Sequence, residues 1–310
     1  MISPSASQLQ SFLDDLNAEM RMRTDWGKPA GYIPELADVP VEQFAISVAL
    51  PDGQVISAGQ HETAFSIQSV SKVFTLACVL GRIGDQLWGR VGREPSGTSF
   101  DSIVLLEREE GRPRNPFINA GAIVTTDALL EGRMPRDTLA EVLQFLRGAA
   151  DDDDIHIDKA VAASEKATGH RNAALAHYLA SCNNLRNAPD LTLGTYFHQC
   201  AIAMTTDQLA RAGRVFARLP DVPMQLAPPR ARRIAALMMT CGHYDGSGDF
   251  AFRVGLPGKS GVGGGILIIA PGKASIAVWS PGLNRYGNSL VGTEAAERLG
   301  RFTGWSVFEG

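Results

Sequence analysis

A serine and a lysine three positions apart form a candidate nucleophile and base. Ser69 and Lys72 stand in the segment SVSK (69–72), where the first of several helical patterns begins. Residues at i and i+3 share one face of a helix, so the hydroxyl and the amine would lie side by side. A serine becomes a good nucleophile when a base removes its proton, and a lysine can be that base once burial lowers its pKa. The alternative is an ordinary helix start with an exposed lysine.

A glycine-rich segment late in the chain supplies a second element of such a site. The sequence KSGVGGG (259–265) leads directly into an apolar strand. Glycines allow close approach of the backbone to a ligand, and an edge strand offers free N–H groups. The N–H of Val262, together with that of Ser69, could therefore form an oxyanion hole. By itself the segment could be a glycine-rich turn, but its combination with the Ser–Lys pair favours acyl-transfer chemistry.

Hydrophobic periodicity predicts the elements that would position these groups. An amphipathic helix over 8–23 precedes a β-hairpin over 42–59, and helical patterns then fill the chain from about 67 to 241. These helices are predicted over 69–84, 117–131, 135–147, 159–180, 205–218 and 228–240. Alternating or continuous apolar residues predict strands over 250–256, 265–270 and 276–280, before a closing helix over 289–300.

This order of elements predicts an α+β fold. Two early strands and three late ones would form a five-stranded antiparallel sheet built from both chain ends, with a helical lobe beside it. We expect residues 1–310 to form a single catalytic unit. Residues 1–60 and 245–310 would make the sheet lobe with its terminal helices, and residues 61–244 the helical lobe.

Composition excludes several classes of protein. The 310 residues are 45% hydrophobic and 20% charged with a net charge of −4, which argues against a nucleic-acid binder. No apolar run is long enough for a membrane span, and the amino terminus lacks the pattern of a signal peptide. Four widely spaced cysteines match no zinc pattern, so we expect reduced thiols in a cytoplasmic protein.

No residue pattern requires a metal or an organic cofactor. The acidic run over 151–154 could suggest a calcium loop. It lacks the alternating ligands and the glycine of an EF-hand, so we interpret it as a solvated loop.

The Ser–Lys and Lys-Ser-Gly elements resemble those of the serine β-lactamase and penicillin-binding protein superfamily. Within that superfamily, six blocks in order along the chain resemble the serine-dependent glutaminases. The blocks are GYIPEL (31–36), IQSVSKVF (67–74), RNPFINAGAI (114–123), SE (164–165) with RN (171–172), CGHYDGSG (241–248) and KSGVGGG (259–265). The resemblance implies a β-lactamase/transpeptidase-like fold and a homodimer or homotetramer.

The resemblance also implies hydrolysis of L-glutamine to L-glutamate and ammonia. Ser69 would be the nucleophile, Lys72 the general base, and Tyr244 a relay of the proton to the departing ammonia. Substrate contacts are implied for Tyr32, Gln68, Ser69, Asn119, Glu165, Asn172, Tyr196, Tyr244 and Val262.

The chemistry of three of these residues suits glutamine. Glu165 and Asn172 are seven residues apart on a predicted helix and therefore on one face. Glu165 could hold the α-ammonium of the substrate, while the amides of Asn119 and Asn172 could hold its α-carboxylate. Without the resemblance, Glu165 would be interpreted as a solvent-exposed acid.

Two other functions stay open at this point. An enzyme of the same superfamily could act on a β-lactam or a peptide, although such enzymes work outside the cytoplasm. A non-catalytic module could retain the cleft, but it would be expected to lack Ser69 or Lys72, and both are present.

Overall fold

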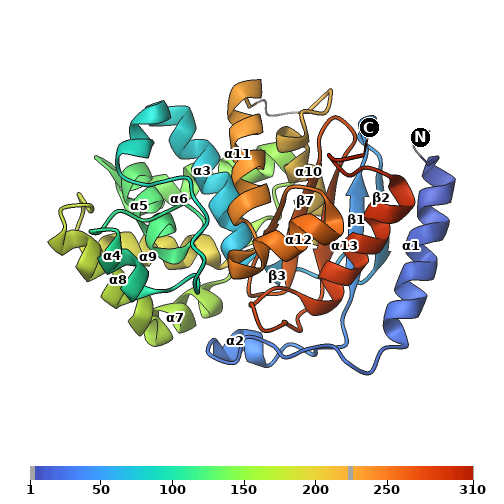
Figure 1. Ribbon diagram of the computed structural model, residues 1–310, viewed down its shortest axis with the longest axis horizontal. Helices are drawn as coiled ribbons and strands as arrows, with labels where there is room; N and C mark the ends of the chain where they lie inside the picture. Colours follow the sequence, from blue (N-terminus) through green and yellow to red (C-terminus); the bar gives the residue numbers. More distant parts are fainter. Residues whose placement is uncertain (1–3, 223–225, 310) are drawn as a thin grey trace.

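A five-stranded antiparallel sheet with the order β2-β1-β8-β7-β6 is the centre of the computed structural model (Figure 1). The structure describes residues 4–222 and 226–309. The strands are β1 (Ala45–Ala49), β2 (Val55–Gly59), β6 (Gly258–Ser260), β7 (Gly265–Ala270) and β8 (Ala274–Trp279). β1 pairs with β8, so the sheet joins the two ends of the chain. The predicted sheet and its antiparallel order are confirmed.

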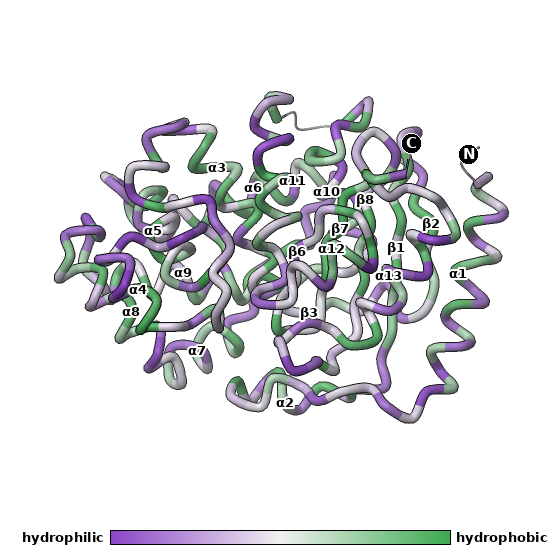
Figure 2. The backbone as a smooth tube through the Cα atoms, in the orientation of Figure 1, coloured by the Kyte–Doolittle hydropathy of each residue, from purple (hydrophilic) through white to green (hydrophobic). Residues whose placement is uncertain are grey.

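Both faces of this sheet are covered by helices. Along β7, Ile266 and Ile268 point to one side and pack with α1 (Ala6–Arg21) and α13 (Leu290–Thr303). Leu267 and Ile269 point to the other side, where α10 (Thr206–Ala217) lies. All six residues of β7 are buried because the alternation of a strand sends apolar side chains into a core on each face. Figure 2 shows hydrophobic segments gathered around β1, β7 and β8.

Most of the remaining helices pack beside the sheet, on the left in Figure 1. The long ones are α3 (Ser71–Ile83), α5 (Asn119–Leu130), α6 (Pro135–Ala150), α7 (Lys159–Thr168), α8 (His170–Ser181), α9 (Pro189–Cys200) and α11 (Pro228–Cys241), and α2 (Pro34–Ala37) and α4 (Ile103–Arg108) are short. Every residue of α5 is buried, so this helix runs through the middle of the group. The helical lobe over 61–244 remains a prediction. Within that range, α10 packs on the sheet and not only on other helices.

The strand predicted over 250–256 is wrong. This segment belongs to α12 (Ser247–Val254), and the third late strand is β6, which carries the Lys-Ser-Gly sequence. The alternating apolar residues at 250, 252 and 254 wrongly indicated a strand. Phe250 and Val254 are also one helical turn apart, and both are buried in the helix. Phe252 is 91% exposed, which fits a helix and not a strand buried on one face.

The single helix predicted over 159–180 is also wrong. It divides at Gly169 into α7 and α8. A Cβ at Gly169 would lie 2.5 Å from the Glu165 carbonyl oxygen and 2.6 Å from the Phe197 ring, so the break passes too close to its neighbours for any side chain. Glu165 and Asn172 therefore lie on different helices.

The sequence patterns did not predict α2, α4 or α9. They also did not predict a small sheet with the order β3-β5-β4, made of β3 (Phe65–Ser66), β4 (His156–Ile157) and β5 (Ile202–Met204). Strand β3 of this sheet leads directly into the segment that carries Ser69. In the described part of the chain, none of the helices has the length and apolar character needed to span a bilayer.

Candidate active site

Ser69 lies in a short 3₁₀ turn (Gln68–Val70) that joins the small sheet to the start of α3. Gln68 has a φ of +48°, which is uncommon for a residue with a side chain and is typical of functional sites. The turn after β6 presses against this segment. A Cβ at Gly261 would stand 2.5 Å from the Ile67 carbonyl oxygen and 3.1 Å from the Ser69 nitrogen, so only glycine fits.

The backbone of Val262 follows directly. Within residues 4–222 and 226–309, its N–H makes no backbone hydrogen bond. The close approach of Gly261 to the Ser69 nitrogen brings the two amides of the expected oxyanion hole into one neighbourhood.

Lys72 is buried beneath Ser69 at the first turn of α3. Its Nζ donates hydrogen bonds to Asn119 Oδ1 (2.8 Å) and to the Phe117 carbonyl oxygen (3.2 Å). Burial lowers the pKa of Lys72 from 10.5 to about 8, against the smaller opposing influence of Cys200, Glu165 and Asp101. A neutral amine is therefore accessible near neutral pH, as a general base requires.

Tyr244 lies near Ser69, in η3 (Tyr244–Gly246), which follows α11. Its φ is +56°, and its hydroxyl donates to the Ser260 carbonyl oxygen at 3.4 Å. Burial raises the pKa of the Tyr244 phenol, and hydrogen bonding with the Ser69 side chain partly offsets that rise. The phenol is therefore neutral at physiological pH and can pass a proton on.

Lys259 is a buried residue that the sequence analysis left without a role of its own. Its Nζ donates to the carbonyl oxygens of Ser260 (2.5 Å) and Gly242 (3.1 Å) and lies 4.5 Å from the centre of the Tyr244 ring. Burial and the charge of Lys72 hold the pKa of Lys259 well below its usual range. In the sequence, the Lys-Ser-Gly motif was the feature that could have indicated that Lys259 belongs to the site.

A cavity of about 280 Å³, here called the inner cavity, opens at Ser69. It is lined by eight of the predicted residues, namely Tyr32, Gln68, Ser69, Asn119, Glu165, Asn172, Tyr196 and Val262. Lys72 lies below the floor, and Tyr244 lines a neighbouring cavity. Seven further lining residues were not predicted, namely Ile33, Phe100, Asp101, Thr168, Gly169, Arg171 and Cys200. Of these, Asp101 and Arg171 form an ion pair at 3.1 Å.

Glu165 is the buried acid of the inner cavity. Only 7% of the residue is exposed, and its Oε1 has no hydrogen-bond partner in the described structure. Burial raises the pKa of Glu165 to about 7, although a hydrogen bond from Gln68 and the charge of Lys72 oppose the rise. An unpaired buried carboxylate oxygen is costly unless a cation or donor joins it, so this atom is suited to a ligand ammonium.

Amide groups line the wall next to Glu165. Asn119 Nδ2 donates to Asn172 Oδ1 at 2.9 Å, and the Tyr196 hydroxyl donates to Asn119 Oδ1 at 3.3 Å. Asn119 is also the first residue of α5, so the positive end of that helix dipole lies at the cavity wall. This wall is suited to an anionic group.

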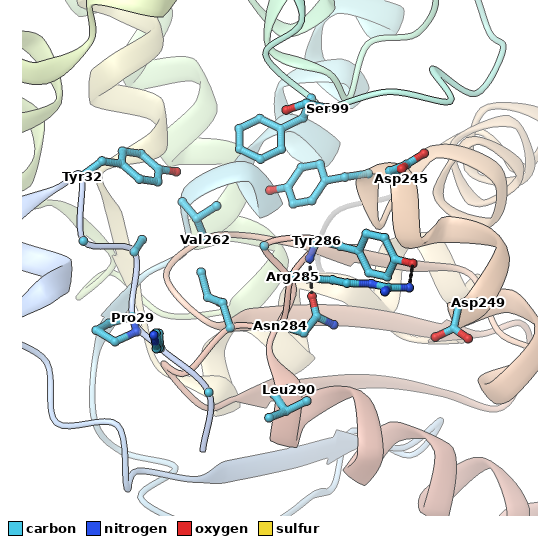
Figure 3. Close-up of a pocket in the computed structure, with 18 of the residues that line it drawn as sticks. Pro29, Tyr32, Ser99, Asp245, Asp249, Val262, Asn284, Arg285, Tyr286 and Leu290 are labelled. Atoms are coloured by element: carbon cyan, nitrogen blue, oxygen red, sulfur yellow. Dashed lines mark hydrogen bonds between the residues drawn. The ribbon is translucent and has the colours of Figure 1, made fainter. Parts of the chain in front are cut away.

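A second, more open cavity of about 1040 Å³ adjoins the first (Figure 3). This outer cavity includes Tyr244 and shares Tyr32, Phe100 and Val262 with the inner one. The candidate nucleophile therefore lines the inner cavity, and the candidate proton relay lines the outer one.

Comparisons with known proteins identify similar sequences and structures. A family model described as Glutaminase matches residues 27–308. A glutaminase of Azorhizobium caulinodans is 61% identical over 307 residues, which cover 98% of this chain and 99% of the relative.

Solved structures show the same β-lactamase-like fold. The probable glutaminase ybaS superimposes with a TM-score of 0.93 at 35% identity, covering 99% of this chain and 100% of the other. Mglu in its glutamate form gives a TM-score of 0.91 at 34% identity, covering 97% of this chain and 70% of that one.

Proposed function

The chain belongs to the glutaminase family, and on this premise we propose that it hydrolyses L-glutamine to L-glutamate and ammonia through an acyl-enzyme on Ser69. The observation that carries the proposal is the inner cavity, which is lined by both Ser69 and Glu165, whose Oε1 has no hydrogen-bond partner in the described structure. Its volume of about 280 Å³ is at the small end of ligand pockets, which suits a free amino acid.

Binding would use Glu165 and the amide groups on the neighbouring wall of the cavity. Glu165 holds the α-ammonium, and the amides of Asn119 and Asn172 with the Tyr196 hydroxyl hold the α-carboxylate. Gln68 supports Glu165, and Tyr32 closes the rim that the two cavities share. Fixing both charged groups leaves the side-chain amide as the part of the substrate that reaches Ser69.

Acylation begins with proton removal by Lys72. Ser69 Oγ attacks the amide carbon, and the N–H groups of Ser69 and Val262 stabilise the oxyanion. The proton held by Lys72 passes through Tyr244 to the amide nitrogen, the C–N bond breaks, and ammonia leaves. Water then attacks the γ-glutamyl ester, with Lys72 again as base, and releases glutamate and free Ser69.

Lys259 contributes to these reaction steps by holding Tyr244 in position. Its bonds to the Ser260 and Gly242 carbonyl oxygens and its place under the Tyr244 ring make it a positioning residue for the phenol. No step of this mechanism calls for a metal or an organic cofactor.

The family resemblance also supports a homodimer or homotetramer, which light scattering would test. All four cysteines are free thiols, each in the described ranges, and this agrees with the cytoplasm as the proposed location.

The test of the reaction is ammonia release by the purified protein from L-glutamine, with L-asparagine and the Ser69→Ala variant in parallel. We expect release from glutamine that the substitution abolishes. Rapid hydrolysis of a chromogenic β-lactam with no release from glutamine would contradict the proposal and favour the β-lactam alternative.

A further inference from the structure

A cavity of about 370 Å³ adjoins the active site at Val262 but lies outside it. Val262 lines this cavity as well as the inner and outer ones. We call it the rear cavity and define it by Glu35, Phe65, Val262, Gly263 and Trp279, which all line it. Except for Val262, whose N–H belongs to the proposed oxyanion hole, none of the residues given a catalytic or binding role lines it.

The short helix α2 and the residues before it separate the rear cavity from the inner one. Ile33 lines the inner cavity, whereas Glu35 and Leu36 line the rear one. Ile33 and Leu36 belong to one small core with Val262. In Figure 1, α2 lies near α7, the helix that carries Glu165, and the two helices pack together. A ligand in the rear cavity would therefore be a neighbour of the glutamine site without entering it.

The charges of the rear cavity are all negative. Among the described residues that line it, the titratable side chains are those of Glu35, Asp38 and Asp158. Asp158 is already used as the N-cap of α7, where its Oδ1 accepts hydrogen bonds from the N–H groups of Ala160 and Val161. No lysine, arginine or histidine stands among these lining residues, so the walls supply no cation to the other two carboxylates.

Glu35 is the carboxylate that most needs a partner. Its Oε2 is buried and has no hydrogen-bond partner in the described structure. Burying a charged oxygen without a donor is costly, so a donor that enters the cavity would be favoured there. An ammonium group brings a positive charge and three donors, and its hydrogen bonds to a carboxylate are among the stronger ones in proteins.

Aromatic rings form an apolar part of the wall. The buried rings of Phe65 and Trp279 stack with their centroids 5.1 Å apart and an interplanar angle of 10°. The Trp279 Nε1 already donates to the Gly263 carbonyl oxygen at 3.0 Å. The polar atom of the indole is therefore occupied, and Leu36 and Val39 add aliphatic surface to the same cavity. This wall is suited to the apolar body of a ligand.

From these features we propose that the rear cavity is a binding site for a small primary amine with a short apolar body. The ammonium pairs with Glu35, and the apolar body lies against Phe65 and Trp279. A volume of about 370 Å³ is at the small end of ligand pockets, which suits such an amine. A metal ion fits less well, because the described residues include no group of three or more His, Cys, Asp or Glu side chains placed to hold one. The site goes beyond the proposed function and does not depend on it.

Isoamylamine is the probe, because it is an ammonium at neutral pH and carries a branched apolar body. Trp279 lines the cavity, so its fluorescence should report binding. In titrations of the purified protein we expect a saturable change with a Kd on the order of 1 mM, as is typical of so small a ligand. The change should persist with L-glutamate present, since the proposed function places glutamate in the inner cavity. Isoamyl alcohol, with the same body and no charge, should bind at least about tenfold more weakly.

Two variants connect the binding to the rear cavity. Glu35→Gln should weaken isoamylamine at least about tenfold, while Glu62→Gln, at an exposed acid outside the cavity, should leave the affinity unchanged. Trp279→Phe keeps an aromatic ring beside Phe65 and should abolish the fluorescence change, while calorimetry still detects binding. Trp88→Phe, at a tryptophan outside the cavity, should keep the fluorescence change.

The results that would overturn the site differ from those that bear on catalysis. No saturable fluorescence change and no heat of binding would overturn the amine site, and so would equal affinities for the amine and the alcohol. An affinity unchanged in Glu35→Gln would overturn the pairing with that carboxylate. Complete displacement of isoamylamine by L-glutamate would assign the amine to the inner cavity instead. Failure to hydrolyse glutamine would overturn only the proposed function.

Discussion

Lys72 Nζ donates a 2.8 Å hydrogen bond to Asn119 Oδ1, so the proposed base and a proposed substrate-binding amide are held by one contact. The Nδ2 of the same amide donates to Asn172 Oδ1 on the wall of the inner cavity. The proposed binding and proton-transfer groups are thereby linked through a single side chain. Changes to Asn119 should therefore affect the protonation of Lys72 as well as the affinity for substrate.

The first prediction concerns the charge beside Lys72. Asn119→Asp places a carboxylate where the amide oxygen stood, and a nearby negative charge favours the protonated lysine. The pKa of Lys72 should rise from about 8, so that activity at pH 7.5 falls by roughly tenfold or more and recovers in part above pH 9. The measurement is kcat/KM against pH.

Asn172→Asp is the matched control, because it adds the same charge to the cavity without a hydrogen bond to Lys72. It should raise KM with a smaller displacement of the pH profile. Equal displacements in the two variants would count against the Lys72–Asn119 coupling.

The second prediction concerns the acid limb of the pH profile. Glu165, with its pKa raised to about 7, must lose a proton to hold the α-ammonium, and Lys72 must lose one near pH 8 to act as base. Below pH 7 both groups are protonated, so log kcat/KM should fall with a slope that approaches two. Glu165→Gln should reduce kcat/KM by roughly 10²-fold and leave a slope of one. A slope of two in that variant would exclude Glu165 from the titration.

The third prediction concerns the stability cost of the buried base. The unfolded chain holds the Lys72 proton up to about pH 10.5 and the folded chain only up to about pH 8, a difference that corresponds to about 3 kcal/mol at pH 7. Lys72→Met should therefore be inactive but more stable at pH 7. The expected gain in the free energy of unfolding is about 1–2 kcal/mol, because two acceptor oxygens lose a partner.

The sign of the pH dependence follows from proton binding. Between pH 8 and 10.5 the unfolded wild type binds more protons than the folded protein, so wild-type stability rises relative to Lys72→Met. Urea unfolding at pH 7 and pH 10 measures how far the stabilities of the wild type and Lys72→Met approach each other at the higher pH. Lys166→Met, at an exposed position of α7, should change stability by less than about 0.5 kcal/mol at either pH. A Met variant less stable than wild type at pH 7 would contradict the cost assigned to burial.

The fourth prediction concerns Lys259. Because it contacts the Tyr244 ring and does not line the inner cavity, Lys259→Met should lower kcat by roughly ten- to a hundred-fold with little change in KM for glutamine. Steady-state kinetics separate the two constants, and Lys273→Met, exposed in the turn between β7 and β8, is the control. A change confined to KM would indicate a binding role instead.

The parts of the fold that local patterns describe were predictable. Amphipathic periodicity located α1, α10 and α13, and the family resemblance named eight residues that meet in the inner cavity. The wrong predictions lie where tertiary contacts determine the local secondary structure. The break at Gly169 depends on the Phe197 ring, which lies 28 residues away, and the helix at 247–254 depends on which of its phenylalanines finds a core.

The sequence could not predict which side chains of the site are buried or which groups surround them. Nothing local indicates that Lys259 lies under Tyr244 or that Glu165 has an orphaned oxygen. Both are consequences of segments about 15 residues or more apart being packed together. The outer cavity has the same origin, since its walls come from the segment before β1, the turn at η3 and the loop before α13.

The most direct test of the account is to trap the acyl-enzyme. Purified protein is mixed with L-glutamine, quenched in acid within milliseconds and analysed by intact mass and peptide mapping. We predict a mass increase of one γ-glutamyl group, located on Ser69 and missing from Ser69→Ala. Ammonia release that proceeds with no covalent adduct, or an adduct on another residue, would contradict it.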